Sequence, residues 1–178
     1  MSILLQMTGL SGAGKTTIAE ATKARLIALG YAIEIIDGDT YRKTLCKDLG
    51  FSKADRLENI RRLGQVGLDT IAKGTIAILA VINPYQAARQ ALQAKSPFVK
   101  TIFINCPLSI TTERDTKGLY RRALLPTEHP DYIGHFTGIS DPFEPPQDAD
   151  LTLNTGQQTI AESVEMLVAF VLKNVTIK

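Results

Sequence analysis

Gly9-Leu10-Ser11-Gly12-Ala13-Gly14-Lys15-Thr16 is the stretch of this 178-residue chain that constrains its fold most strongly. It matches the pattern GxxxxGK[ST] in full, and it lies between an apolar run at residues 3–7 and an amphipathic stretch at residues 15–29. Glycines let the backbone curl so that successive N–H groups face phosphate oxygens, and a following helix directs its dipole at them. The stretch therefore predicts a strand, a phosphate-binding loop and a helix in succession.

A guanine-nucleotide switch, which would make the chain a regulatory protein, is an alternative interpretation of this loop. Such a switch needs an Asn-Lys-x-Asp element to recognise guanine, and the sequence has none. Asp-x-x-Gly occurs only at residues 115–118 and 131–134, in a polar segment far from the early strand end where a γ-phosphate sensor belongs. The pattern favours an ATP-dependent enzyme.

The residue types in the loop indicate how it would hold ATP. Lys15 is placed to bridge the β- and γ-phosphates, and the hydroxyl of Thr16 is placed to bind Mg²⁺. The other positions would contribute mainly backbone N–H groups. The predicted ATP-binding residues of the loop are Gly9, Leu10, Ser11, Gly12, Ala13, Gly14, Lys15, Thr16 and Thr17.

Short apolar runs alternate with amphipathic stretches along the chain. The runs lie at residues 3–7, 32–36, 75–82, 99–105 and 151–153, and the third is apolar enough for a central strand buried on both faces. Strands separated by helices indicate βαβ units. We therefore predict an α/β fold with a doubly wound, mainly five-stranded parallel sheet flanked by helices, in a single domain over residues 1–178.

Capping residues mark the expected helices. Gly30 suits the position after the first helix, residues 15–29, and Ser52 opens a second helix with a capping box. A third helix is opened by Pro84, and a last one covers residues 160–171. The face of the first helix that should turn toward the core carries Ile18, Thr22, Leu26 and Leu29.

Residues 115–146 break this alternation. The segment is polar, rich in proline and glycine, and long for a connection in a compact domain, so we interpret it as a lid over a ligand. His129 and His135 fall within it. A metal-binding or acid–base role is one interpretation of these histidines, and we favour the other, that they are solvated loop residues.

The overall composition is that of an ordinary globular protein, with 44% hydrophobic and 21% charged residues. A net charge of +2 gives no reason to expect nucleic acid or an anionic membrane as partner. Cys46 and Cys106 lie far apart and form neither a metal-binding spacing nor a disulfide framework. Without a visible leader peptide or membrane-length apolar run, we expect a cytoplasmic protein.

Two carboxylates follow the second predicted strand, in the run Asp37-Gly38-Asp39-Thr40-Tyr41-Arg42. Ligands of doubly wound sheets bind outside the carboxyl ends of the strands, so this run should lie beside the phosphate loop. Phosphoryl transfer to a hydroxyl needs a carboxylate that positions the nucleophile and accepts its proton. We assign that role to Asp39, with Asp37 in the Mg²⁺ shell or sharing the role. The alternative is an Asp/Gly turn with solvated carboxylates.

Arg56 and Asn59 lie three residues apart near the start of the second predicted helix, so they share a face beside a helix N-terminus that favours anions. A surface ion pair, such as Glu58 with Arg62, is the alternative use of charge on this helix. Phe51, in the preceding loop, is by itself more often a core residue than a stacking platform.

Six stretches of the chain resemble adenylyl-sulfate kinases in wording and order. They are GLSGAGKTT, DGDTYR, LCKDLGFSKADRLENIRR, NPYQAAR, CPLSITTERDTKGLYRRA and FTGISDPFEPP, and the resemblance runs from residue 9 to about residue 153. That family phosphorylates the ribose 3′-hydroxyl of adenylyl sulfate with ATP, giving 3′-phosphoadenylyl sulfate in sulfate activation. The resemblance therefore implies a P-loop kinase that uses Mg²⁺ and forms a homodimer.

The same resemblance assigns roles to single residues. Lys15 and Thr16 would serve ATP and Mg²⁺, Arg114 would cover the ATP adenine, and Thr155 would flank that base. Asp37 would join Asp39 at the transfer centre. The residues implied to contact adenylyl sulfate, with the two phenylalanines stacking on its adenine and the lysine reaching from the lid, are Asp39, Arg42, Phe51, Arg56, Asn59, Ile82, Asn83, Lys117 and Phe136.

The chain departs from the family pattern at two places. Asn83 stands where most members have a serine, which is thought to be phosphorylated in some, and because an amide holds no stable phosphoryl group we predict direct in-line transfer. The lid is longer than usual over residues 124–132. We favour a neutral insertion, and the alternative is a change in acceptor choice or in the rate of lid closure. The alternatives to an adenylyl-sulfate kinase are a relative with a different nucleotide-linked acceptor and a nucleotide-binding regulator without catalysis.

Overall fold

The structure, a computed structural model that describes residues 2–175, contains a five-stranded sheet with the strand order β2-β3-β1-β4-β5. The four pairs of neighbouring strands run parallel. The prediction of a doubly wound parallel sheet is therefore confirmed. The strands are β1 (Leu4–Thr8), β2 (Ile33–Asp37), β3 (Ile76–Ala80), β4 (Val99–Asn105) and β5 (Leu151–Asn154).

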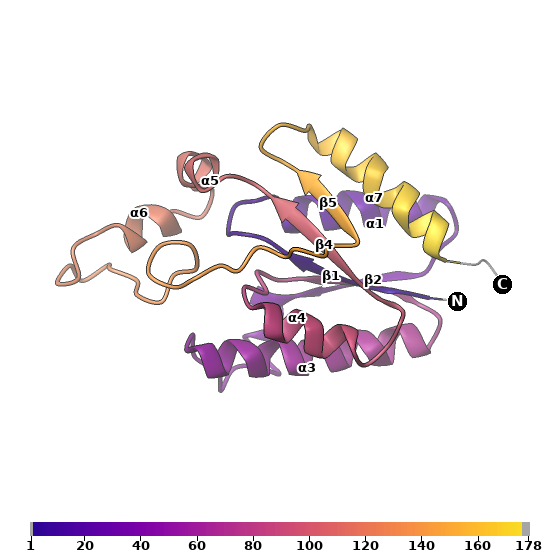
Figure 1. Ribbon diagram of the computed structural model, residues 1–178, viewed down its shortest axis with the longest axis horizontal. Coiled ribbons are helices and arrows are strands. Elements are labelled where there is room, and N and C mark those ends of the chain that lie inside the picture. Colours follow the sequence, from indigo (N-terminus) through magenta and orange to yellow (C-terminus); the bar gives the residue numbers. More distant parts are fainter. Residues whose placement is uncertain (1, 176–178) are drawn as a thin grey trace.

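Helices cover both faces of the sheet (Figure 1). On one face lie α1 (Lys15–Ala28) and α7 (Ile160–Asn174), and on the other lie α3 (Lys53–Ala72) and α4 (Gln86–Gln93). Parallel strands need such crossovers, because each strand must start again from the same edge. Three short helices follow strand ends or each other: α2 (Gly38–Tyr41), α5 (Leu108–Arg114) and α6 (Leu119–Ala123).

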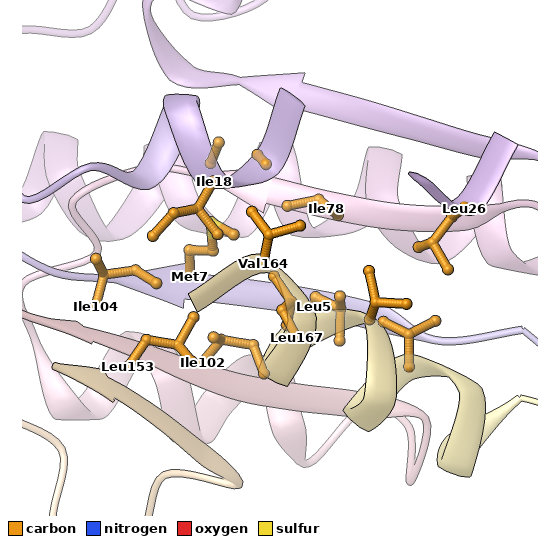
Figure 2. Packing of buried hydrophobic residues seen from close by; sticks show 14 of the residues in the cluster. Leu5, Met7, Ile18, Leu26, Ile78, Ile102, Ile104, Leu153, Val164 and Leu167 are labelled. Carbon is orange, nitrogen blue, oxygen red and sulfur yellow. The ribbon is translucent and has the colours of Figure 1, made fainter. Parts of the chain in front are cut away.

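The core is divided between the two faces by the alternation along β1. Leu5 and Met7 pack with α1 and α7 in the cluster drawn in Figure 2, whereas Leu4 packs with the α3 side. A Cβ on Gly67 of α3 would lie 2.7 Å from Leu4 Cδ1, so glycine lets this helix approach the sheet closely. Every residue of β1 is buried, so the strand has no alternation of buried and exposed positions, as is typical of a central parallel strand covered on both faces.

The helix ends mostly agree with the sequence prediction. Gly30 follows α1 with a φ of 87°, and the Ser52 hydroxyl caps α3, while the helix after Pro84 begins at Gln86. The core prediction for Leu29 is wrong, because this residue is 51% exposed. It is the C-cap of α1, where the chain leaves the helical path and the buried face is no longer continued. The other three predicted core positions, Ile18, Thr22 and Leu26, are buried.

The predicted lid, residues 115–146, has a small core of its own, which a polar segment did not lead us to expect. Tyr120, Ala123 and Phe136 are buried together, and the first two come from α6. The carboxylate of Asp115 accepts hydrogen bonds from the N–H groups of Tyr120 and Arg121, two donors in the first turn of α6 that have no partner within the helix. In Figure 1 the segment extends away from the sheet beyond α5. It is a folded unit that can hold side chains in place.

Candidate active site

The phosphate loop joins β1 to α1 and turns through Gly9, Gly12 and Gly14, which all have positive φ. A Cβ on Gly9 would lie 2.5 Å from the carbonyl oxygen of Ile104, so β4 leaves room only for glycine there. The loop sequence therefore serves two requirements at once, the backbone curl and the close approach of a neighbouring strand.

Lys15 is buried within this loop, with 9% of its surface exposed. Its Nζ donates hydrogen bonds to the carbonyl oxygens of Gly9 at 2.9 Å and Leu10 at 2.7 Å. The pKa of Lys15 is lowered to about 7, chiefly by burial and also by the charge of Lys117, while the charge of Asp39 opposes the change. A buried ammonium group of this kind is stabilised strongly when an anion such as phosphate binds beside it.

The two predicted catalytic carboxylates lie where β2 ends. Asp37 is the N-cap of α2, and its Oδ1 accepts hydrogen bonds from the N–H of Thr40 at 2.9 Å and from its hydroxyl at 3.1 Å. Asp39 follows in the first turn of α2 and accepts a hydrogen bond from Lys117 Nζ at 2.6 Å. In place of the Asp/Gly turn of the alternative interpretation, residues 38–41 form the short helix α2, and Asp37 and Asp39 border a cavity shared with the phosphate loop.

This cavity measures about 720 Å³ and brings the predicted donor and acceptor sides together. It is bordered by the phosphate loop, the tip of β2, the start of α3, the loop after β3 and the lid. The predicted site residues that line it are Ser11, Gly12, Gly14, Lys15, Thr16, Thr17, Asp37, Asp39, Arg42, Phe51, Arg56, Asn59, Ile82, Asn83, Lys117 and Phe136.

Five predicted ATP-binding residues do not line this cavity: Gly9, Leu10, Ala13, Arg114 and Thr155. Two of these residues, Thr155 just after β5 and Arg114 in α5, are connected to the phosphate loop by hydrogen bonds. The hydroxyl of Thr155 donates to the carbonyl of Ala13 at 2.7 Å, and Arg114 Nη2 donates to the carbonyl of Thr155 at 2.9 Å. The contact of this pair with the ATP adenine remains a prediction.

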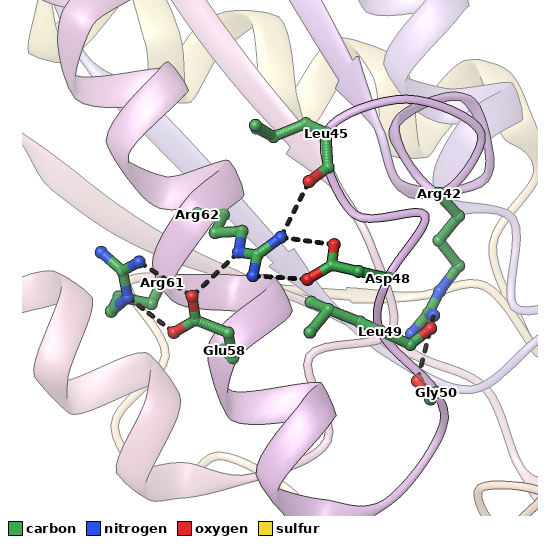
Figure 3. A network of polar contacts seen from close by, with 8 residues as sticks. All are labelled: Arg42, Leu45, Asp48, Leu49, Gly50, Glu58, Arg61 and Arg62. Carbon is green, nitrogen blue, oxygen red and sulfur yellow. Dashed lines mark hydrogen bonds and ion pairs between the residues drawn. The ribbon is translucent and has the colours of Figure 1, made fainter.

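Phe51 is a surface platform, because 54% of its surface is exposed. The guanidinium of Arg42 lies 4.3 Å from the centroid of its ring, within cation–π range. Arg42 Nη1 also donates to the carbonyl oxygens of Leu49 and Gly50, as Figure 3 shows, and so holds the loop that precedes the ring. The alternative of a core role for Phe51 does not apply.

Arg56 is 8% exposed and connects α3 to the lid. Its Nε donates to the carbonyl of Phe51 at 3.0 Å, while its Nη2 donates to the carbonyl of His135 and lies 3.3 Å from the carboxylate of Asp141. Asn59, on the same face, is 6% exposed, and among the described residues its Oδ1 has no hydrogen-bond partner. A buried acceptor at the cavity wall is suited to a donor group of a ligand.

The surface ion pair proposed as an alternative for α3 also exists, on residues that do not line the cavity. Glu58 accepts hydrogen bonds from Arg61 and Arg62 (Figure 3). Arg62 in addition grips Asp48 through two hydrogen bonds of 2.6 and 2.8 Å and donates to the carbonyl of Leu45 at 2.9 Å. The ion pair of the alternative interpretation is therefore confirmed on one face of α3, and the contact of Arg56 and Asn59 with adenylyl sulfate on the other face stays a prediction.

Asn83 follows β3 and is 1% exposed, with a positive φ of 45°. Its Nδ2 donates to Gln6 Oε1 at 3.2 Å. The buried guanidinium of Arg89 donates to the carbonyl of Asn83 at 2.8 Å and to the carbonyl of Glu144 at 2.6 Å. The loop at the cavity floor is thus held from β1, from α4 and from the end of the lid.

Sequence reasoning missed Tyr120, Asp141 and Arg89. These residues do not line the cavity, but they hold groups that do. All three stand inside the stretches that resemble the family, and that position was the available signal. His129 is exposed and does not line the cavity, which agrees with the favoured interpretation of a solvated loop residue. His135 is also exposed, but it borders the cavity and its Nδ1 lies 3.5 Å from the carboxylate of Asp141. Cys46 and Cys106 are buried free thiols. None of the helices within residues 2–175 has the length and apolar character to cross a membrane.

Phosphoryl transfer requires an anion cradle for the donor and a carboxylate that faces it from the acceptor side. The cavity offers both at the carboxyl edge of a doubly wound sheet, so fold and site define an enzyme of the P-loop kinase class. Within that class, residues 1–154 match the family described as adenylylsulphate kinase, and the chain belongs to this family.

Similar proteins agree with this placement. The chain is 46% identical over 162 residues to the adenylyl-sulfate kinase of Microcystis aeruginosa, covering 91% of this chain and 87% of that protein. Its structure resembles that of the Mycobacterium tuberculosis APS kinase CysC in complex with AMPPNP and APS, with a TM-score of 0.88, 33% identity and coverage of 97% and 98%. A hexameric APS kinase from Thiobacillus denitrificans matches with a TM-score of 0.71, 29% identity and coverage of 97% and 29%.

Proposed function

We propose that this chain transfers the γ-phosphoryl group of ATP directly to the ribose 3′-hydroxyl of adenylyl sulfate, giving 3′-phosphoadenylyl sulfate and ADP. The observation that carries the proposal is the cavity of about 720 Å³ that contains both Lys15 and Asp39. Its volume lies within the range typical of small-molecule sites. The relative from M. tuberculosis, which was solved with AMPPNP and APS, supports the same pair of ligands.

On the donor side, the backbone of the phosphate loop and Lys15 would hold the β- and γ-phosphates. Lys15 Nζ donates hydrogen bonds to two carbonyl oxygens of the loop, and a phosphate would replace them as its partner. The positive charge is most useful where charge builds up on the transferring group and on the leaving oxygen of ADP. Lys15 therefore acts on the transition state more than on binding.

On the acceptor side, Asp39 would accept the proton of the 3′-hydroxyl while that oxygen forms its bond to the γ-phosphorus. The bond between phosphorus and the β–γ bridging oxygen breaks in the same step, and ADP leaves. Lys117, which lies 2.6 Å from Asp39, would hold this carboxylate and the lid together during the reaction. Phe51 and Phe136 border the same cavity and would receive the adenine between them.

Mg²⁺ fits the site as a partner of the nucleotide. Thr16 and Asp37 both line the cavity and would supply a hydroxyl and a carboxylate oxygen, and hard oxygen ligands are what Mg²⁺ prefers. Within residues 2–175 there is no cluster of three or more acidic, histidine or cysteine side chains that would bind a metal alone. Such an ion would take its remaining ligands from phosphates and water, and it would neutralise phosphate charge.

Direct transfer is proposed because Asn83 provides no hydroxyl for a phosphoryl-enzyme. Its side chain is buried and engaged with Gln6, so it acts as part of the cavity floor. Incubation with γ-labelled ATP should leave the purified protein unlabelled. Stoichiometric and stable labelling would contradict direct transfer.

ADP release with ATP and adenylyl sulfate, compared with other nucleotides as acceptors, tests the function. Rapid turnover with adenylyl sulfate alone supports the proposal. Turnover with a different nucleotide-linked acceptor would favour the alternative that the longer lid and Asn83 suggest, and no turnover with any acceptor would favour a regulatory role.

We also propose a homodimer, to be checked by light scattering, and a cytoplasmic location, which suits two free thiols.

A further inference from the structure

Tyr120, on α6 of the lid, contacts both sides of the cavity although it does not line it. Its hydroxyl donates a hydrogen bond to the carbonyl oxygen of Ser11 in the phosphate loop at 2.9 Å. Its ring meets the ring of Phe136 edge-on, with centroids 5.0 Å apart and an interplanar angle of 86°. The side chain is 1% exposed, so neither contact is a loose surface encounter.

The bond to Ser11 bears directly on nucleotide binding. The carbonyl of Ser11 and the N–H of Gly12 belong to one planar trans peptide unit, so they point in opposite directions. In a phosphate loop such N–H groups donate to phosphate oxygens. A phosphate bound on the N–H side polarises the peptide unit and makes its carbonyl a better acceptor for Tyr120. Nucleotide binding therefore strengthens the attachment of α6 to the loop.

The other contact bears on the acceptor. Phe136 borders the cavity, and its ring is held against that of Tyr120 within the small lid core. The lid also meets the loop just beyond this ring, because a Cβ on Gly138 would lie 2.8 Å from Leu10 Cδ2. The position of α6 on the phosphate loop thus sets the position of the ring that would meet the adenine of the acceptor.

We infer that Tyr120 is a positioning residue through which ATP and adenylyl sulfate bind cooperatively. A nucleotide in the loop holds Tyr120, and Tyr120 holds Phe136 ready for the acceptor. By thermodynamic linkage the acceptor tightens nucleotide binding by the same factor. This inference rests on the proposed function, since it needs a nucleotide at the loop and a nucleobase at Phe136.

The test is a comparison of the wild type with Tyr120→Phe, which removes one hydroxyl and keeps the ring. Isothermal titration calorimetry would measure the Kd of adenylyl sulfate with and without saturating AMPPNP, and the Kd of AMPPNP with and without adenylyl sulfate. Each pair of values gives a coupling factor, which should exceed one in the wild type. We expect Tyr120→Phe to reduce this factor about fivefold, as for the loss of one buried hydrogen bond, and to change the single-ligand values less.

An equal factor in Tyr120→Phe and wild type, or a factor of one in the wild type, overturns the inference. Tyr31→Phe removes a hydroxyl just before the amino end of β2, whereas the cavity lies at the carboxyl ends of the strands, so this control should leave the coupling factor unchanged. An equal loss of coupling in Tyr31→Phe also overturns the inference. If Tyr120→Phe fails to fold by circular dichroism, Phe136→Leu breaks the link at its other end. The same reduced factor is expected there, and an unchanged factor contradicts the link.

The two proposals fail separately. A wild type that couples the ligands but releases no ADP sinks the proposed function and leaves the role of Tyr120 standing. Turnover of adenylyl sulfate with unchanged coupling in Tyr120→Phe leaves the function standing and removes the role of Tyr120.

Discussion

The Nζ atom of Lys117 lies 2.6 Å from Oδ2 of Asp39, so a lid residue and a strand-end residue 78 positions apart in sequence form an ion pair at the rim of the cavity. Their side chains are 56% and 72% exposed, and an ion pair so open to water adds little to stability. Its consequence is geometric, because it places the lid against the carboxylate proposed as the base.

Asp39→Ala should lower kcat by about a thousandfold with a small change in either KM, since a general base acts in the transition state. Steady-state ADP release at saturating substrates measures this effect. Asp69→Asn, at an exposed carboxylate in α3, is the matched control and should keep wild-type rates. Near-normal kcat in Asp39→Ala would show that the base is another group.

The rate should depend on pH through Lys15, whose pKa burial lowers to about 7 in the free protein. Only its protonated form attracts phosphate, so kcat/KM for ATP should fall about tenfold per pH unit above that value. Bound phosphates raise the pKa again, so kcat should stay flat over the same range. Profiles of both constants between pH 6 and 9 would be measured, and a parallel fall of the two contradicts this role of Lys15.

The same shift affects stability with a definite sign. The folded pKa of Lys15 lies below its ordinary value of 10.5, so between about 7 and 10.5 the unfolded state binds more protons than the folded one. This residue therefore makes the protein more stable as pH rises through that window. Lys15→Met should be more stable than the wild type at pH 7, with a difference in Tm that shrinks toward pH 10. A constant difference would be the contrary result.

Arg56→Ala should raise the KM for adenylyl sulfate about tenfold and leave the KM for ATP within about twofold. The reason is that the substitution removes a buried charge-assisted hydrogen bond on the acceptor side of the cavity and none on the ATP side. Asp141→Asn keeps the arginine but weakens its hold on the lid, and a smaller change in the same constant is expected. Equal rises in both Michaelis constants would mean that Arg56 supports the whole cavity.

Arg62 and Arg61 offer a matched pair on adjacent positions. Both bind Glu58, but Arg62 alone of the two also holds Asp48 and Leu45, in the loop that leads to Phe51 (Figure 3). Arg62→Met should raise the KM for adenylyl sulfate about fivefold by loosening that loop, while Arg61→Met should not, as expected for an exposed i,i+3 ion pair. Equal effects of the two substitutions on this constant would contradict a loop-holding role.

Much of the fold followed from short segments. The phosphate loop, the five strands and the caps at Gly30 and Ser52 depend on local dihedral preferences and on periodicity, which are visible in a window of a few residues. Leu29 shows where that reasoning ends, since its exposure depends on where α1 stops and the chain turns. The helix α6 was missed because a polar lid can bury a few side chains against one another without showing a clear period.

The sequence alone determined that this chain cradles phosphate, folds as a doubly wound sheet and carries the stretches of the adenylylsulphate kinase family. Only the tertiary structure decided which side chains meet: Tyr120 with Ser11, 109 positions away, and Arg56 with Asp141, 85 positions away. The physical reason is that backbone preferences act over a few residues, whereas contacts between distant segments depend on how whole helices and strands pack around a common core.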